Sequence, residues 1–393
     1  MPLKTASTDV FPMLAKTVAG LEPLLLAELN AMGAIDAVVL TRAVSFSGNM
    51  EMMYKANYLC RTALRILKPI YSFVADDEDE FYDGVRDVDW SAYLSVKNTF
   101  AIDAVASNSS FTHTKYLSQK AKDAIVDQFR EAKGIRPSVD LENPDIRIDV
   151  HVNGQQCTLS LDSSGASLHK RGYRRNTHEA QANEVLAAGM IMLSEWDKQS
   201  PLVDFMCGSG TILIEGAMAA YKIPAGYYRK DWGFMHWTDY DKSLWKLTLD
   251  RNEPDIRNTK GPVMMGSDIS PKSIAQSREN ITHCGLQDKI SVMRLDFIDF
   301  EPPQPPGVLI TNPPYGERIE VDDIIALYQE IGDELKKKFA GYSAWLISSD
   351  FQALKFVGLH PKKKYKVFNG PLECRFAGFE LYAGSKKLKN EGK

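Results

Sequence analysis

The sequence predicts two classes of fold in one chain: an α+β region over residues 1–164 and an open, mainly parallel α/β sheet over residues 179–384. In the first region, short strand-like and helix-like runs alternate without an internal repeat. In the second, apolar strands end in polar turns that lead into helices, a pattern typical of a parallel sheet. With 393 residues, 44% of them hydrophobic, the chain can bury cores for two or three domains.

The N-terminal region is predicted from its hydrophobic periodicity. The helix over residues 21–32 is the clearest, because its leucines form one apolar face and Gly33 ends it. Ser, Gly and basic side chains follow this region, so we expect a basic linker over 165–178. The strand-like runs are 10–18, 35–48, 62–74, 98–106 and 146–161, and the helical runs are 21–32, 49–58, 79–87 and 114–132.

The C-terminal region is predicted to begin with a helix over about 179–195 and to end with strands at 342–349, 361–368 and 373–383. We expect its lysine-rich tail, 385–393, to be disordered. A long insertion, roughly 222–261, is too aromatic for a disordered loop. We expect a small satellite core there, with base stacking as the alternative, formed by Tyr227, Tyr228, Trp232, Phe234, Trp237, Tyr240 and Trp245.

The most informative motif follows the apolar run 307–310 and reads Asn312-Pro313-Pro314-Tyr315. The prolines end the strand and stiffen the loop, so the Asn312 amide and the Pro313 carbonyl can be held as two convergent acceptors. Such a fork suits the two hydrogens of a planar exocyclic amine, and Tyr315 offers a face on which the ring can stack. A simple strand-ending turn is the alternative. A partner motif upstream argues against it.

The partner motif, residues 201–215, is an apolar strand, the turn Cys207-Gly208-Ser209-Gly210 and a helix start. Its glycines let a ligand approach the backbone and leave N–H groups free at the helix start. A dinucleotide fingerprint would need a small residue in place of Leu213, and a phosphate loop would need a lysine, which is absent. Asp204, just before the turn, suits a cofactor with a cationic aminoacyl end.

Two further predicted strands end in acids. Asp268 is placed to accept both hydroxyls of a ribose, and Asp296 with Phe297 suits the amine and the face of an adenine. Any one of these acids alone is more often a helix cap or turn residue. The ordered series, at the strand ends where open parallel sheets bind ligands, favours a nucleoside-containing cofactor.

At these motifs the chain resembles the class I S-adenosylmethionine-dependent methyltransferases. It is most similar to the THUMP-domain RNA methyltransferases, in particular the bacterial enzymes that methylate guanine N2 in 23S ribosomal RNA. The motifs that carry the resemblance are 204–211, Leu-His-Lys-Arg-Gly-Tyr-Arg at 168–174, and 312–318, and the similarity extends over nearly the whole chain. Some members of that group carry a second methyltransferase domain, for which this chain ends too soon.

The resemblance implies a Rossmann-like, seven-stranded methyltransferase domain preceded by ferredoxin-like and THUMP segments. It implies S-adenosylmethionine as cofactor and RNA as partner, first of all 23S rRNA or a ribosome-assembly intermediate. It further implies these roles: Asp204, Cys207, Gly208 and Gly210 around the methionine moiety, Asp268 at the ribose, Asp296 and Phe297 at the adenine, and Asn312, Pro313, Pro314 and Tyr315 at the target base.

Composition narrows the choice of partners. A net charge of −4 argues against a generally basic nucleic-acid binder, so an RNA surface must be local. We expect the basic residues of 168–175 to contact an RNA backbone and Lys336–Lys338 to be a solvated helix face, with Lys362–Lys366 a further candidate. Five scattered cysteines without a C-x-x-C pair suggest neither a zinc site nor disulfides. Together with the lack of an export signal or an apolar span, this predicts a cytoplasmic protein, and we favour a monomer.

Two classes of function stay open at this stage. The first is a methyltransferase acting on an exocyclic amine, where the loop alone does not separate guanine N2 from adenine N6, nor ribosomal from transfer RNA. The second is a non-catalytic RNA-binding or ribosome-assembly factor that has kept the fold.

Overall fold

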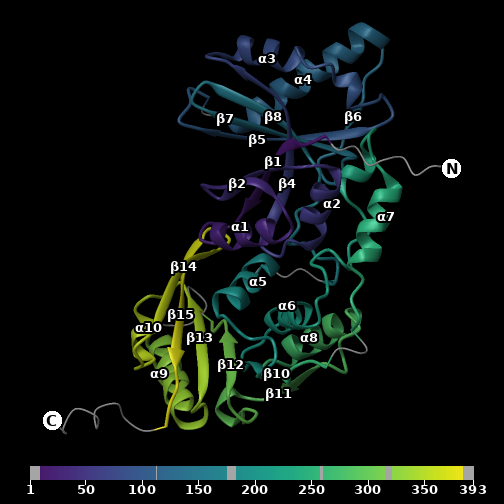
Figure 1. The fold of residues 1–393 in the computed structure, drawn as a ribbon. Helices are drawn as coiled ribbons and strands as arrows, with labels where there is room; N and C mark the ends of the chain where they lie inside the picture. Colours follow the sequence, from purple (N-terminus) through teal and green to yellow (C-terminus); the bar gives the residue numbers. More distant parts are fainter. Residues whose placement is uncertain (1–8, 112, 175–182, 257–259, 315–320, 384–393) are drawn as a thin grey trace. The chain divides into compact units, whose positions relative to one another are not determined.

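The computed structural model describes residues 9–111, 113–174, 183–256, 260–314 and 321–383, and the chain divides into two compact units (Figure 1). Unit 1 comprises Met1–Thr17, Leu25–Lys170 and Arg229–Asn252. Unit 2 comprises Val18–Leu24, Arg171–Tyr228 and Glu253–Lys393. None of the helices in the described ranges is long and apolar enough to cross a membrane.

Unit 1 contains an eight-stranded sheet in the order β2-β3-β1-β4-β8-β7-β5-β6. The predicted runs 35–48 and 146–161 each prove to be two strands, because a turn with a left-handed residue, Arg42 or Gly154, reverses the chain. The strands are β1 (Phe11–Thr17), β2 (Ile35–Leu40), β3 (Ala43–Gly48), β4 (Ala63–Val74), β5 (Thr99–Ser107), β6 (Ser138–Val139), β7 (Ile146–Asn153) and β8 (Gln156–Asp162).

The four helices predicted for this region are confirmed to within a residue or two. Asn49 and Asp77 cap two of them by accepting backbone N–H groups of the first turn. The helices are α1 (Glu22–Ala31), α2 (Met50–Leu59), α3 (Glu78–Arg86) and α4 (Thr114–Lys133).

The aromatic insertion packs into the core of unit 1, although the sequence placed it inside the catalytic domain. It forms a short 3₁₀ turn, η2 (Gly233–His236), and α7 (Lys242–Arg251). The Phe234 ring centroid lies 4.5 Å from that of Tyr54 and 5.0 Å from that of Trp245. Trp232, Phe234 and Trp245 are buried there, so these aromatic residues do form a core. It is part of the main core of unit 1, so the expected small satellite core is wrong, and Tyr227 and Tyr228 belong to unit 2.

Unit 2 contains a seven-stranded sheet in the order β11-β10-β9-β12-β13-β15-β14. The first five of these strands are parallel, and β15 runs antiparallel to both of its neighbours. This confirms the predicted α/β class. The strands are β9 (Leu202–Asp204), β10 (Met264–Asp268), β11 (Ile290–Arg294), β12 (Gly307–Thr311), β13 (Tyr342–Ser348), β14 (Lys363–Asn369) and β15 (Leu372–Glu380).

Helices cover both faces of this sheet (Figure 1). Val203 and Leu309 pack in one core cluster with residues of α9 and α10, whereas Leu202 points to the opposite face and meets Gly216 of α6. That alternation along β9 is why the strand is apolar throughout. The helices are α5 (Glu184–Leu193), α6 (Thr211–Ala220), α8 (Pro271–His283), α9 (Val321–Lys338) and α10 (Ala353–Phe356).

Arg171 and Tyr173 of the basic segment before α5 are buried, so the expectation that these two residues contact RNA is wrong. The Arg171 side chain is 1% exposed and pairs with Glu215 of α6 at 3.3 Å, and the Tyr173 hydroxyl donates to the same carboxylate. Arg174 pairs with Glu184 and donates to the Thr211 hydroxyl. These side chains bind the segment to the start of the catalytic unit. Lys336 and Lys337, by contrast, form ion pairs on the exposed surface of α9 as expected, whereas the Lys338 side chain is only 12% exposed and pairs with Glu301 and Glu334.

Candidate active site

The carboxyl ends of β11, β10, β9 and β12 lie side by side in the sheet and bring the predicted site residues to one edge. Asp204 ends β9, Asp268 ends β10, Asp296 follows β11 and Asn312 follows β12. Asp268 accepts the Gly208 N–H of the turn after β9, and Asp204 accepts the hydroxyl of Thr311, the residue before Asn312. The ordered acids of the sequence are therefore neighbours in space, as the strand order of an open parallel sheet requires.

The turn after β9 requires its glycines. Gly208 and Gly210 have φ angles of +54° and +80°, in the left-handed region that other residues rarely adopt. A Cβ atom on Gly208 would meet no atom within 4 Å, whereas one on Gly210 would lie 3.2 Å from Ser277. Gly208 therefore faces open space where a ligand can approach, while Gly210 is needed for the conformation and for packing against α8.

Cys207 belongs to the architecture of the turn. Its backbone N–H donates to the Ser267 carbonyl at 2.8 Å, and burial raises the pKa of its thiol well above the ordinary value. A buried thiol of this kind is unreactive. We therefore see Cys207 as a residue that ties the turn to β10.

Asp268 connects the glycine turn to the start of α8. One carboxylate oxygen accepts the Gly208 N–H at 2.9 Å, and the other accepts the Ser270 N–H at 2.9 Å. Each carboxylate oxygen can accept a second hydrogen bond. Asp268 is thus held rigidly and keeps the capacity to take two ribose hydroxyls, which fits the predicted role.

The adenine position differs in part from the prediction. Asp296 is half-buried and caps the Ile298 N–H, but the Phe297 ring is only 7% exposed and lies 5.5 Å from Phe205, inside the core. The sequence analysis missed two exposed apolar side chains, Ile269 (64%) and Ile298 (41%), which follow the ends of the adjacent strands β10 and β11. Exposed apolar side chains at two adjacent strand ends are suited to contact the faces of a flat ring. The available signal was an apolar residue one position after Asp268 and two positions after Asp296.

Asp204 is tied to the loop that carries the target motif. It is 1% exposed, and its Oδ1 accepts the Thr311 hydroxyl at 2.8 Å and the Met206 N–H at 3.2 Å. Burial raises the pKa of this carboxyl to about 7, the two hydrogen bonds oppose that rise, and the charge of Asp268 adds to it. Asp204 therefore joins β9 to the residue before Asn312. Its role as counter-ion to the cofactor stays a prediction.

The target loop begins at the end of a fully buried strand. The Asn312 side chain oxygen Oδ1 is buried and accepts no hydrogen bond within the described part of the chain. Pro313 is buried and Pro314 exposed, so the loop leaves the sheet directly after this unpaired acceptor. Buried acceptors without a donor are rare and call for an explanation. Tyr315 lies outside the described residues, and its stacking role stays a prediction.

Comparison with known proteins identifies the family. Residues 171–377 match the family model described as "RMKL-like, methyltransferase domain", residues 75–162 match the THUMP domain, and residues 12–67 match the RlmL ferredoxin-like domain. The chain belongs to the RMKL-like methyltransferase family. The predicted resemblance, the fold and S-adenosylmethionine as cofactor are thereby confirmed.

Two relatives match nearly the whole chain. The chain is 40% identical over 370 residues to "Ribosomal RNA large subunit methyltransferase K/L" of Methylococcus capsulatus, covering 92% of this chain and 50% of the relative. It is 36% identical over 377 residues to "Putative RNA methyltransferase slr0064" of Synechocystis, covering 96% and 98%. The chain thus spans about half the length of the K/L relatives and nearly all of the Synechocystis protein.

Two solved structures share the architecture. A putative methyltransferase, SMU.472, solved in complex with SAH, superposes with a TM-score of 0.85 at 29% identity over 96% of this chain and 99% of that one. A predicted N6-adenine-specific DNA methylase of Listeria monocytogenes superposes with a TM-score of 0.83 at 27% identity over 95% and 97%.

Proposed function

We propose that this protein transfers a methyl group from S-adenosylmethionine to the exocyclic N2 amine of a guanine in structured RNA, with 23S ribosomal RNA as the first candidate substrate. The observation that carries the proposal is the buried Asn312 Oδ1 at the end of β12, which accepts no hydrogen bond from any residue that the structure describes. A base amine is the donor that this acceptor lacks. The K/L and Synechocystis relatives, by their names, support RNA as the substrate.

The bound cofactor would supply a methyl group on a cationic sulfonium. Asp268 would hold its ribose, Ile269 and Ile298 would flank its adenine beside Asp296, and the open side of Gly208 would accommodate the remainder. These residues would hold the cofactor beside the end of β12, because β9 and β12 are adjacent in the sheet.

The lone pair of an aromatic amine is delocalised into its ring, so the amine is a poor nucleophile. Asn312 Oδ1, by accepting one amine hydrogen, shifts electron density towards nitrogen and fixes its direction. Positioning of this kind can lower a barrier by about 7–11 kcal/mol. After transfer the nitrogen is acidic enough to lose its proton to solvent, so no general base is required. Thr311, held by Asp204, keeps the strand end in place.

Unit 1 would position the RNA. Its THUMP match and its separate fold support this role, as does the lack of site residues in residues 1–164. A target base in a helix must also leave its stack, which costs a few kcal/mol and has to be offset by contacts elsewhere. Contacts between unit 1 and the RNA should therefore make methylation by the full chain more efficient than it would be without them.

The main rival is methylation of adenine N6, since the same acceptor suits either amine and one structural neighbour is described as an adenine methylase. A transfer RNA guanine and a non-catalytic assembly factor are further alternatives. Mass spectrometry of nucleosides from separated ribosomal and transfer RNA of cells with and without the gene decides among them, with loss of N2-methylguanine from ribosomal RNA as the proposed outcome. Loss of N2-methylguanine, restored by the purified protein with S-adenosylmethionine, is expected. Loss of N6-methyladenine instead, or no change, would refute the proposal.

A further inference from the structure

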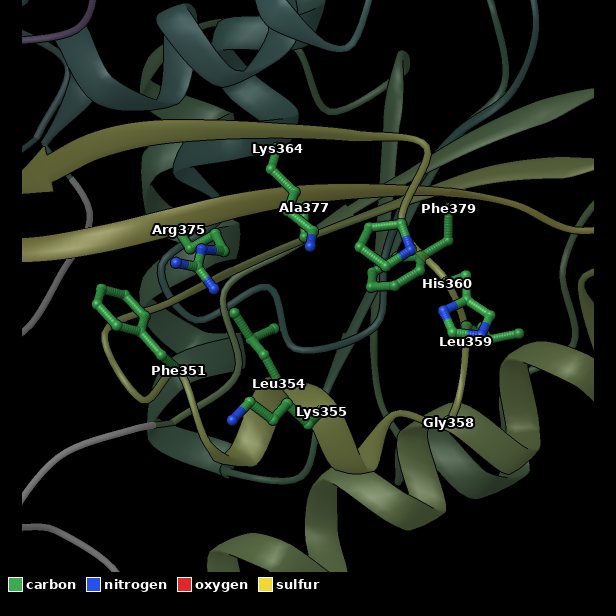
Figure 2. A pocket seen from close by; sticks show the side chains of 11 residues that line it. Phe351, Leu354, Lys355, Gly358, Leu359, His360, Lys364, Arg375, Ala377 and Phe379 are labelled. Atoms are coloured by element: carbon green, nitrogen blue, oxygen red, sulfur yellow. The ribbon is translucent and has the colours of Figure 1, made fainter.

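A hollow of about 360 Å³ lies in unit 2 away from the cofactor residues, between α10 and strands β14 and β15 (Figure 2). Its polar lining comes from Lys355, His360, Lys364 and Arg375, and its apolar lining includes Phe351. Of the described residues that line it, none is acidic. We call this site the basic hollow. In a chain with a net charge of −4, a cavity that gathers two lysines and an arginine with no acidic residue among its described lining needs an explanation.

The lysine cluster of the sequence resolves into paired and unpaired members around the basic hollow. Lys362 pairs with Glu380, Lys363 with Glu195 at 2.6 Å, and Lys366 with Glu373 at 2.6 Å. Lys364 forms no ion pair within the described ranges, and it lies opposite Ala377, which also lines the hollow. The cluster therefore leaves one cation available for a ligand.

Arg375 is the second available cation. It too forms no ion pair with a described residue, and its guanidinium lies 4.6 Å from the centroid of the Phe351 ring. Figure 2 shows the two side chains next to each other at one end of the basic hollow, with Lys364 directed between them and His360. A cation beside an aromatic ring is the combination by which proteins hold single-stranded nucleic acid, one for the phosphate and one for the base.

The position of the basic hollow relates it to the target loop. Arg375 pairs in register with Ser348 at the end of β13, and β13 pairs with β12, which ends just before Asn312. Two strand spacings, about 10 Å, separate the strand of Arg375 from that of Asn312. Both therefore lie towards the same edge of the sheet, within reach of one stretch of RNA.

We propose that the basic hollow binds a nucleotide that neighbours the methylated base, with Lys364 and Arg375 on its phosphate and Phe351 beside its base. The inference rests on the proposed function, because it takes the RNA substrate as given. A base that has left its stack must be held out by its own strand, and a neighbouring phosphate anchored on the catalytic unit does this.

Lys364→Ala in the full chain tests the proposal, and Lys363→Ala is the matched control, because it removes the same charge one residue away on the opposite face of β14. Binding of ribosomal RNA from cells lacking the gene is measured over a series of salt concentrations. We expect Lys364→Ala to weaken binding about three- to tenfold and to lower the salt slope by about one. Lys363→Ala should leave both unchanged, and both variants should melt and bind SAH like the wild type.

Equal RNA binding and salt slopes for the two variants would overturn the basic hollow as an RNA site. A photo-crosslinking amino acid in place of Phe351 provides a second measurement, and we expect it to label a nucleotide flanking the modified one. Labelling at a distant nucleotide, or none, contradicts the proposal. If the wild-type protein binds this RNA but does not methylate it, the proposed function is refuted. The difference in salt slope between the two variants then still tests whether the basic hollow binds RNA. Wild-type protein that does not bind the RNA at all refutes both.

Discussion

Asn312→Ala should leave the stability of the protein nearly unchanged while it slows methyl transfer. The Oδ1 atom is buried and has no donor among the described residues, and a buried acceptor in that state costs about 1–3 kcal/mol. Truncation removes this cost, but it also removes packed side-chain atoms, worth about 1 kcal/mol per group of methylene size. The two effects oppose each other, so we expect the free energy of unfolding to change by no more than about 1 kcal/mol and Tm by no more than about 4 °C.

The rate should respond very differently. Loss of one preorganised polar group at a reacting centre typically costs 10²–10³-fold, or about 3–4 kcal/mol of barrier. Single-turnover methylation with saturating RNA and cofactor measures this step free of binding. Cofactor affinity, measured by calorimetry, should stay within about twofold. Asn312→Asp is the matched control, because it keeps an acceptor oxygen in place, and it should retain more of the rate than alanine does.

The opposite pattern would refute the reasoning. If Asn312 only ends a strand, alanine should lower the melting temperature clearly and leave the single-turnover rate of the folded protein near normal. A catalytic role thus predicts a slower rate with little change in stability, and a structural role predicts lower stability with little change in rate. A single pair of measurements on one variant separates them.

Three further variants test the rest of the site. Asp204→Asn should abolish a loss of stability between pH 5 and pH 7. Burial raises the pKa of Asp204 to about 7, so the folded carboxyl keeps a proton that the unfolded chain releases near pH 4, and the resulting stabilisation of the folded state is lost as pH rises to 7. Two pH units correspond to about 3 kcal/mol in the difference between variant and wild type, measured by denaturant melts, and parallel curves would contradict the assignment. Asp268→Ala should weaken cofactor binding more than tenfold in calorimetry, since charge-assisted hydrogen bonds are worth about 1.5–3 kcal/mol, and unchanged affinity would exclude Asp268 from the ribose site. Arg171→Met should lower the free energy of unfolding by about 3–5 kcal/mol, because it leaves the buried Glu215 carboxylate without its cationic partner. The double variant Arg171→Met/Glu215→Met should recover most of that stability in thermal melts. A double variant as unstable as the single one would count against the buried ion pair.

The fold and the order of the site residues were predictable from the sequence, because both depend on local signals. Strand ends, turns and helix starts are determined by neighbouring residues in the sequence. The parallel α/β pattern then brings the carboxyl ends of the strands to one edge of the sheet. The neighbouring positions of Asp204, Asp268, Asp296 and Asn312 were predicted in this way, and their roles stay predictions. The backbone of the glycine turn likewise follows from Gly208 and Gly210 themselves.

What the sequence did not predict depends on partners far apart in the chain. Arg171 was expected on the surface because arginines usually are, and only Glu215, 44 residues later on α6, explains its burial. Thr311 and Asp204 are 107 residues apart, so their hydrogen bond had no local signature. The aromatic residues around Trp232 were correctly expected to form a core, but composition does not say which unit the core belongs to.

The hydrogen bonds at the sheet edge connect the cofactor side of the site with the target side. Asp268 holds Gly208, and Asp204 holds both Met206 in the same turn and Thr311 beside Asn312. Asp204 is poised between its two protonation states near neutral pH, since its pKa is about 7 and the charge of Asp268 contributes to that value. A positive charge next to the turn would favour the ionised form of Asp204, and an ionised carboxylate accepts a stronger hydrogen bond from Thr311. The strand end that carries Asn312 would then be held most firmly when the methyl donor is present, which is when its position matters for the reaction.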